Sequence, residues 1–235
     1  LPEDPRRCYV SMGIYLFTAS TMYDQLFRDA GRPTSGHDFG KNIIPDMINE
    51  SRSVFAYPFV DENRKDAQYW RDVGTLDAYY QANMDLVAVE PVLNLYDQEW
   101  PIRTHQPPVP PPKFVFAEDG PGARRGTALD STVSQGCIIS GGRVQRSVLS
   151  PGVRINSFAE VEDSILFEGV DVGRHAVIRR AIVDKDVKIP PGFQIGIDLD
   201  WDRRRGFQVT EGGVLVIAKD EALERFQSPE AVAAS

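Results

Sequence analysis

The chain has 235 residues, of which 42% are hydrophobic and 26% charged, a composition typical of a globular protein with one large or two modest domains. Its formal net charge of −8 argues against a general nucleic-acid or membrane-surface binder, because both classes need a basic face. The charge is uneven, since 13 of the 26 Lys and Arg residues fall between Arg124 and Arg205.

Cysteine usage and hydropathy bear on the compartment in which the protein works. Cys8 and Cys137 are the only cysteines, which predicts neither a disulfide framework nor a zinc site and favours the reducing cytoplasm. No apolar run approaches the ~20 residues that a membrane-spanning helix needs. The opening LPEDPRRCYV lacks the pattern of a secretory signal, and we expect it to be the interior of a longer protein.

Strand and helix patterns alternate in the first part of the chain. Nearly continuous apolar runs at 9–17 and 53–60 predict strands, the first buried on both faces. Helical spacing predicts one helix at 20–30 and a second at 37–50, bent or restarted at Pro45. Alternation of this kind predicts an α/β layer architecture.

The loop YWRDVGT (69–75) leads into a third predicted helix, for which Thr75 is a suitable N-cap. In a parallel sheet, ligands gather where loops leave the carboxyl ends of strands. Asp72 offers a carboxylate suited to Mg²⁺, and Trp70 offers a flat apolar face suited to a sugar ring. The plainer alternative is that Asp72 pairs with a neighbouring arginine and Trp70 packs in the core.

Two more polar clusters lie near the ends of predicted elements. Asp38, in HDFGK, fits the N-cap of a helix that begins at Phe39. Ser11 and Tyr15 place polar tips within a predicted buried strand, where they can bond to each other or to the backbone. Together with the YWRDVGT loop, these clusters indicate a ligand site in the first domain.

A proline run, PPVPPP (107–112), separates this pattern from a repetitive one. Segments that begin at Ser147, Ser164 and Ala181 align at steps of 17 residues, and one that begins at Ser131 precedes them by 16. Such short repeats must stack to bury their apolar faces, which predicts a parallel β-helix of about four coils. Apolar residues return at the same phase in each copy: Cys137 and Ile139, Val153 and Ile155, Val170 and Val172, Val187 and Ile189.

The end of the chain offers a cap for this stack, since residues 212–226 predict a strand and a short helix. The run RRR (203–205) cannot be told from a solvated loop by its sequence. We therefore divide the chain into a catalytic-type domain at 1–106, a proline-rich linker at 107–124 and a β-helix with its cap at 125–235.

Several motifs, taken in chain order, resemble bacterial ADP-glucose pyrophosphorylase, the glucose-1-phosphate adenylyltransferase family. The loop YWRDVGT followed by a β-helix is typical of sugar-nucleotide pyrophosphorylases in general, whereas HDFGK and WPIRT indicate the ADP-glucose branch. The resemblance runs from about residue 10 to about residue 226. Its motifs are SMGIYLF, HDFGKNIIP, YWRDVGTLDAYYQANMDL, WPIRT and the coils through IRRAIVDKDVKIPPG.

The resemblance implies a GT-A, Rossmann-like α/β nucleotidyltransferase domain, truncated at its N-terminus, joined to a left-handed parallel β-helix. It implies the formation of ADP-glucose and pyrophosphate from ATP and glucose 1-phosphate, in glycogen biosynthesis, with Mg²⁺ as cofactor. Asp72 would be the catalytic carboxylate that binds the metal. By motif, the hexose-phosphate site would comprise Ser11, Tyr15, Asp38, Phe39, Trp70 and Asp72.

The resemblance also implies regulation and assembly. The family responds to small anionic effectors such as sugar phosphates, pyruvate or AMP, and Lys185 occupies the place of a basic effector contact. The same family forms homotetramers in which the β-helix is a contact surface.

The family's glycine-rich loop, its Glu-Lys-Pro motif and its first metal aspartate do not occur in this sequence. We therefore expect the 235-residue chain to be inactive alone and the intact protein to be active. Two alternatives stay open. One is a regulatory paralogue of the same fold that does not turn over, and the other is a β-helix acyltransferase that uses His175.

Overall fold

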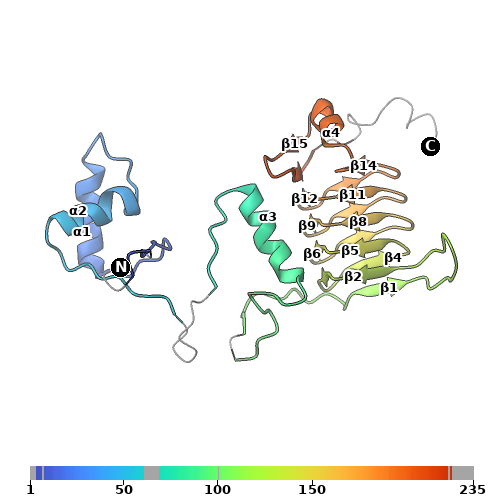
Figure 1. Cartoon of the computed structure of the whole chain (residues 1–235), viewed down its shortest axis with the longest axis horizontal. Helices are drawn as coiled ribbons and strands as arrows, with labels where there is room; N and C mark the ends of the chain where they lie inside the picture. The colour runs from blue at the N-terminus through green and yellow to red at the C-terminus, as the bar shows by residue number, and fades with distance from the viewer. Residues whose placement is uncertain (1–3, 7, 61–68, 100, 222, 224–235) are drawn as a thin grey trace. The chain divides into compact units, whose positions relative to one another are not determined.

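The computed structural model describes residues 4–6, 8–60, 69–99, 101–221 and 223. These residues form two compact units, Leu1–Trp70 and Arg71–Ser235, which are described separately below. The elements of each are labelled in Figure 1.

The described residues of the first unit contain three helical elements. Helix α1 spans Ala19–Ala30, the π-helical turn η1 spans Phe39–Ile43, and α2 spans Ile44–Asn49. The predicted helix at 20–30 is thus confirmed. The predicted break near Pro45 is confirmed as well, because the π-helical turn changes to an α-helix at Ile44, and Pro45 then lies in the first turn, where its missing N–H costs nothing.

The predicted strands of this unit are wrong. Neither 9–17 nor 53–59 forms a strand. Gly13 has a φ of +71°, a left-handed conformation that interrupts a strand, and Pro58 has no N–H to donate to a ladder. Apolar side chains of both segments are exposed, Leu16 and Phe55 by 101% and 89%.

Polar contacts connect the helices of the first unit. Arg28 Nη1 lies 3.3 Å from Glu50 Oε2, Gln25 Nε2 donates to the same carboxylate at 3.4 Å, and Arg32 pairs with Asp46. Exposed ion pairs of this kind each contribute little to stability, on the order of 0–1 kcal/mol. These exposed pairs therefore add little to the stability of the unit.

The second unit is the predicted β-helix, with three parallel sheets (Figure 1). The first sheet consists of β1 (Lys113–Val115), β4 (Ile138–Ser140), β7 (Arg154–Ile155), β10 (Asp171–Val172) and β13 (Lys188–Ile189). The second consists of β2 (Thr127–Leu129), β5 (Arg143–Gln145), β8 (Glu160–Glu162), β11 (Val177–Arg179) and β14 (Gln194–Ile195). The third consists of β3 (Thr132–Val133), β6 (Val148–Leu149), β9 (Ile165–Leu166), β12 (Ala181–Val183), β16 (Leu215–Ile217) and the antiparallel β15 (Gln208–Val209).

Strand register confirms the repeat read from the sequence. Ile139 pairs with Ile155, Ile155 with Val172, and Val172 with Ile189, at steps of 16, 17 and 17 residues. The eight apolar positions predicted at one phase are all buried, and they belong to one continuous core. Three strands per turn give four complete coils, from β2 to β13, as the repeat count predicts.

A column of serines runs along one corner of the stack. Ser147 N–H donates to Ser131 Oγ at 3.0 Å, Ser164 N–H donates to Ser147 Oγ at 3.1 Å, and Ala181 N–H donates to Ser164 Oγ at 3.2 Å. Each hydroxyl bonds a backbone amide of the coil above, so small polar side chains satisfy amides that the corner removes from the sheets. The repeated serine at the first position of the repeat thus has a structural reason.

Helix α3 (Leu76–Met84) packs on the β-helix, followed by the 3₁₀ turn η2 (Asp85–Val87). Figure 1 shows α3 alongside the edge that carries β6, β9 and β12. Tyr80 is buried among Ile165, Ile182 and Val214, and its hydroxyl donates to Asp163 O at 2.7 Å. Because α3 belongs to the β-helix by packing, the compact units divide at Trp70, while the domain boundary at 107–124 stays a prediction.

Both ends of the stack carry covering elements. At the first end, β1 pairs with β4 directly after the proline run, and Gly136 N–H donates to Pro110 O at 2.6 Å. At the other end, α4 (Leu199–Arg205) starts at the N-cap Asp198 and ends at Gly206, whose φ is +98°. Residues 203–205, which the sequence could not distinguish from a solvated loop, therefore belong to a helix.

The predicted final strand of segment 212–226 is confirmed as β16, whereas most of its predicted helix lies outside the described residues. Trp100, the first residue of the WPIRT motif, lies outside them too.

Candidate active site

Four of the predicted site residues meet in the first unit. The Tyr15 and Phe39 rings are stacked, with centroids 5.7 Å apart and an angle of 24° between planes. Phe17 packs at 5.8 Å from Phe39, and the Tyr15 hydroxyl lies 3.0 Å from Ser11 Oγ. The hydroxyl–hydroxyl contact predicted for Ser11 and Tyr15 is thus present, and the aromatic pair presents a flat, partly exposed apolar surface.

Asp38 joins this cluster through the start of η1. Its Oδ1 accepts a hydrogen bond from Lys41 N–H at 2.7 Å, which confirms the predicted N-cap. Gly40 lies between the two polar groups, because a Cβ placed there would be 3.4 Å from Asp38 Oδ1 and 3.6 Å from the Tyr15 hydroxyl. The carboxylate and the phenol therefore flank one stretch of backbone.

A buried carboxylate adjoins the cluster. Asp29, in the last turn of α1, accepts from Ser35 Oγ at 2.6 Å and contacts His37 Nδ1 at 2.7 Å. The Ser35 hydroxyl, followed by His37, lowers the pKa of Asp29. Sequence reasoning missed Asp29 and Ser35, because nothing in the spacing of residues 29–37 distinguishes them from surface polar residues.

The YWRDVGT loop lies at the boundary between the units. Trp70, the last residue of the first unit, is 42% exposed, so the core alternative for it is wrong. Asp72, in the second unit, accepts from Gly74 N–H at 3.0 Å, while the neighbouring Arg71 pairs with Asp85 at 2.8 Å. The convergence of Trp70 and Asp72 with the Asp38 cluster stays a prediction.

Two family models match the chain. Residues 2–88 match a nucleotidyl transferase model, and residues 110–217 match a GlmU-like C-terminal hexapeptide model. The first match covers the candidate site residues, and the second covers the β-helix described above. The α/β nucleotidyltransferase portion and the hexapeptide β-solenoid are therefore both shown.

Curated relatives align with nearly the whole chain. It is 62% identical over 221 residues to "Glucose-1-phosphate adenylyltransferase" of Rhodopirellula baltica, which is 94% of this chain and 49% of the relative. It is 56% identical to the protein of the same name from Koribacter versatilis, over 97% of this chain and 53% of the relative. The resemblance to the glucose-1-phosphate adenylyltransferase family is confirmed. The chain spans about half the length of the curated relatives it matches.

The resemblance implies Mg²⁺ as cofactor, and Asp72 is the carboxylate in this chain that is suited to bind it. Mg²⁺ in nucleotide sites is commonly held by one or two carboxylates, substrate phosphates and water, which fits Asp72 as a single protein ligand. Within the described part of the chain, no group of three His, Cys, Asp or Glu side chains is arranged to hold a metal.

Lys185, the proposed adenylyltransferase effector contact, lies on the turn between β12 and β13. Its Nζ is 3.2 Å from Asp184 Oδ1 and 5.3 Å from the Phe167 ring centroid. The hydrogen bond from the Lys185 backbone N–H is the largest influence that lowers the pKa of Asp184. Phe167 in turn contacts Tyr79 of α3 edge-on, at 6.1 Å.

No helix among the residues that the structure describes is both long enough and apolar enough to cross a lipid bilayer.

Proposed function

We propose that the protein to which this chain belongs forms ADP-glucose and pyrophosphate from ATP and glucose 1-phosphate. The observation that carries this proposal is the grouping of Ser11, Tyr15, Asp38 and Phe39 around one stacked aromatic pair. The names of the curated relatives support the same reaction. Synthesis of ADP-glucose places the protein in α-glucan biosynthesis, as the resemblance implies.

In this reaction, a phosphate oxygen of glucose 1-phosphate attacks the α-phosphorus of ATP, and the bond from that phosphorus to the β-phosphate oxygen breaks as pyrophosphate leaves. No bond to the protein forms, so the side chains act by orientation and electrostatics. The Tyr15 and Phe39 faces suit the hexose ring, and the Asp38 carboxylate suits its hydroxyls. Bound Mg²⁺ would neutralise phosphate charge, with Asp72 as one ligand.

The full-length protein tests the proposal directly. We expect release of pyrophosphate and formation of ADP-glucose when it is given ATP, glucose 1-phosphate and Mg²⁺. UTP, CTP and dTTP, supplied separately, serve as controls for the choice of nucleotide. Turnover with another nucleotide alone would reject ADP-glucose as product, and no turnover with any of the four would reject the proposed reaction.

A regulatory paralogue of the same fold is the second candidate. Presence of Trp70, Asp72 and Asp38 favours the catalytic form, because a protein that does not turn over has no need for the sugar-side residues. The sequence upstream of residue 1 distinguishes the two, since the catalytic form requires a glycine-rich loop to hold the nucleotide phosphates. The acyltransferase alternative would need acyl-CoA turnover through His175, whose ring stacks on Phe158 at 4.9 Å.

Regulation by small anions through Lys185 belongs to the same proposal, as does a homotetramer with the β-helix as contact surface. We expect Lys185→Ala in the full-length protein to weaken the response to sugar-phosphate activators or AMP without abolishing basal turnover. The measurement is the effector concentration for half-maximal response, with Lys188→Ala, on the adjacent strand β13, as control. An unchanged response would remove Lys185 from the effector site.

A further inference from the structure

The carboxylate of Asp29 is placed where it is intrinsically unfavourable. Asp29 is the penultimate residue of α1, and the partial negative charge at a helix C-terminus disfavours an acidic side chain there. The residue is also 5% exposed, and burial of a charge costs stability unless hydrogen bonds compensate for lost water. Both costs indicate that its contacts are specific.

The hydrogen bonds of the Asp29 carboxylate go to Ser35 and His37, which directly precede Asp38 and Phe39. Ser11, Tyr15, Asp38 and Phe39 are called the sugar-side cluster below. The Ser35 hydroxyl donates to Asp29 Oδ1 at 2.6 Å, and His37 Nδ1 lies 2.7 Å from Asp29 Oδ2. Because a carboxylate only accepts, the Nδ1 of His37 carries the proton in this contact. The backbone N–H of His37 also donates to Ser35 Oγ at 3.1 Å, so the three residues form a closed set of hydrogen bonds.

His37 has a backbone conformation that these contacts can hold in place. Its φ of +55° lies in the left-handed region, which is uncommon for residues other than Gly, although His, Asn and Asp adopt it more often than other side chains, and which persists where the surroundings determine it. The next residue is Asp38, whose backbone N–H donates to Asn42 Oδ1 and whose carboxylate begins η1. The conformation at His37 thus sets the direction in which Asp38 and Phe39 leave the loop.

We propose that Asp29 is a positioning residue for the sugar side of the active site. Its carboxylate holds the His37 imidazole and the Ser35 hydroxyl, keeps His37 in the left-handed conformation, and thereby fixes Asp38 and Phe39 against Tyr15. This inference rests on the proposed function, because it takes the ligand of the cluster to be the hexose phosphate. Asp29 itself contacts no substrate.

The test compares Asp29→Ala and Asp29→Asn in the full-length protein. We expect Asp29→Ala to raise KM for glucose 1-phosphate at least tenfold while KM for ATP changes less than twofold. Asp29→Asn, which keeps a hydrogen-bond acceptor of the same shape, should recover part of that loss. Asp24→Ala is the matched control, since Asp24 lies on the same helix and its described ion pairs, with Arg28 and Arg52, are both exposed.

A second variant guards against misfolding of the first. His37 is exposed, and Asn tolerates the left-handed conformation, so His37→Asn should fold while losing the ring that reaches Asp29. If the two groups act through one contact, the double variant should show about the same KM for glucose 1-phosphate as Asp29→Ala alone. Additive effects of the two substitutions would overturn the proposal.

Other outcomes are equally decisive. An unchanged KM for glucose 1-phosphate in Asp29→Ala overturns the positioning role, whether or not the apparent kcat falls in step with a loss of folded protein. A rise of the same size in KM for ATP also overturns it. Failure of the unsubstituted full-length protein to form ADP-glucose would instead reject the proposed reaction. The two failures are therefore distinguished by the unsubstituted protein.

Discussion

At the scale of residues, the sugar-side cluster joins an apolar face to polar groups at its rim. Tyr15 takes part in both, because its ring stacks on Phe39 and its hydroxyl lies 3.0 Å from Ser11 Oγ. An amphipathic ring of this kind suits a hexose, whose faces are apolar and whose edges carry hydroxyls. The cluster therefore offers separable contributions from stacking and from hydrogen bonding.

Phe39→Leu tests the stacking contribution in the full-length protein. We expect it to raise KM for glucose 1-phosphate about 2–12-fold, since a lost aromatic stack is worth on the order of 0.5–1.5 kcal/mol. KM for ATP should stay within about twofold. Phe27→Leu, at an exposed aromatic of α1, is the control, and equal effects of both substitutions would contradict the role of Phe39.

The two thiols predict different reactivity. Cys137 is completely buried in the β-helix, and burial raises the pKa of its thiol, whereas Cys8 is exposed. Because the thiolate is the reactive form, a raised pKa and lack of access both slow alkylation. At pH 8 we expect peptide mapping after brief iodoacetamide treatment to show modification of Cys8, with Cys137 modified only after denaturation. Rapid modification of native Cys137 would contradict its placement in the core.

At this scale, the sequence predicted contacts that follow from local rules and missed one that depends on an unusual turn. Asp38 as an N-cap and the Ser11–Tyr15 contact follow from local rules and are confirmed. Asp29 was not predicted, because its role depends on the left-handed turn at His37, and a single His in a polar segment carries no signal for that conformation.

At the scale of elements, the β-helix derives its stability from stacked apolar positions. Each coil buries its inward side chains against the coils on either side. Truncation of one such side chain therefore leaves a cavity that several neighbouring side chains line. Positions on the outer face have no such neighbours. Replacing a leucine by alanine at one inward and at one outward position compares the two.

Leu149→Ala and Leu129→Ala provide this comparison, because Leu149 is fully buried in β6 and Leu129 is 56% exposed in β2. We expect Leu149→Ala to lower the free energy of unfolding by about 2–5 kcal/mol, the usual cost of a cavity of this size. Leu129→Ala should cost less than about 1 kcal/mol. Denaturant unfolding followed by circular dichroism measures both, and similar losses would contradict the assigned core.

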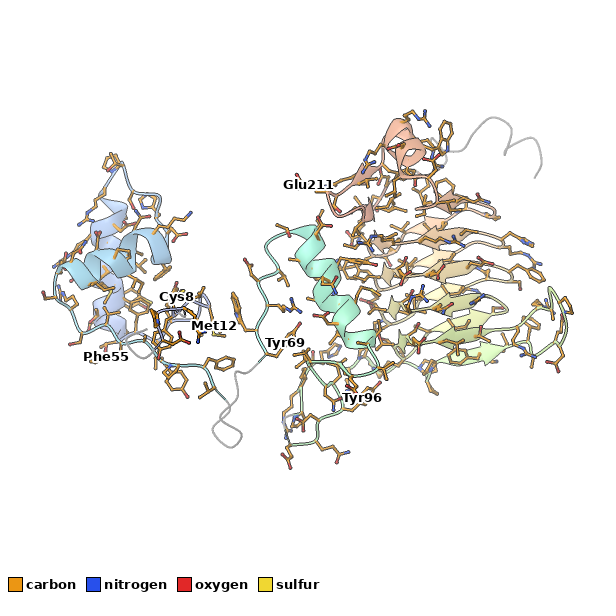
Figure 2. The ribbon with its side chains drawn as sticks, viewed as in Figure 1. Cys8, Met12, Phe55, Tyr69, Tyr96 and Glu211 are labelled. Carbon is orange, nitrogen blue, oxygen red and sulfur yellow. The ribbon has the colours of Figure 1, made fainter. Side chains whose placement is uncertain are left out.

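Helix α3 is attached to the β15–β16 hairpin by one carboxylate. Asp77 accepts from Thr210 Oγ1 at 2.5 Å and from Gly212 N–H at 3.2 Å, and Figure 2 shows Glu211, between these two residues, beside α3. A Cβ at Gly212 would lie 2.5 Å from Asp77 Oδ1. The glycine is therefore required by the approach of the carboxylate, and any side chain there must displace it.

Gly212→Ala should cost about 1–3 kcal/mol of unfolding free energy, since the displaced carboxylate loses its hydrogen bonds. In an Asp77→Ala background, the same substitution should cost much less, because no carboxylate occupies the space. A double-mutant cycle with denaturant unfolding measures the difference. Equal costs in both backgrounds would show that Asp77 is not the group that Gly212 accommodates.

Helices and strands were predicted well where the sequence repeats. They were predicted poorly where strand pairing determines whether an apolar segment forms a strand. The 17-residue phase selects core positions correctly, because each coil imposes the same in-and-out constraint on the next. Apolarity alone predicted strands at 9–17 and 53–60, but a strand also needs a continuous ladder, which Gly13 and Pro58 interrupt. Helix α4 was overlooked despite its capping signals, Asp198 and Gly206.

At the scale of the whole molecule, the chain joins two units that differ in how much apolar surface they bury. The second contains a continuous buried core, whereas the first has exposed apolar segments and polar contacts between its helices. The chain also spans about half the length of its curated relatives. Sequence motifs identified the family, whereas the convergence of Trp70 and Asp72 with Asp38 stays a prediction that spacing alone does not support, because it depends on how separate segments fold together.

We expect the 235-residue polypeptide to form no ADP-glucose by itself, because its sequence contains no glycine-rich loop to hold the nucleotide phosphates. Its β-helix should still fold, so circular dichroism of the same sample controls for loss of structure. The full-length protein, assayed in parallel, provides the positive reference. Measurable synthesis by the 235-residue polypeptide would contradict the assignment of the missing groups.

The coverings at the two ends of the β-helix bear on how the molecule behaves in a crowded solution. A solenoid of identical coils would offer its last strand as a template on which another molecule's first strand could grow, which leads toward fibres. Here the proline run leads directly into β1, the end strand of the first sheet, and the reversed strand β15 occupies one end of the third. The antiparallel direction of β15 and the lack of backbone N–H donors in the proline run both disfavour in-register pairing with another molecule. The β-helix can therefore keep a regular repeat in its core without polymerising end to end.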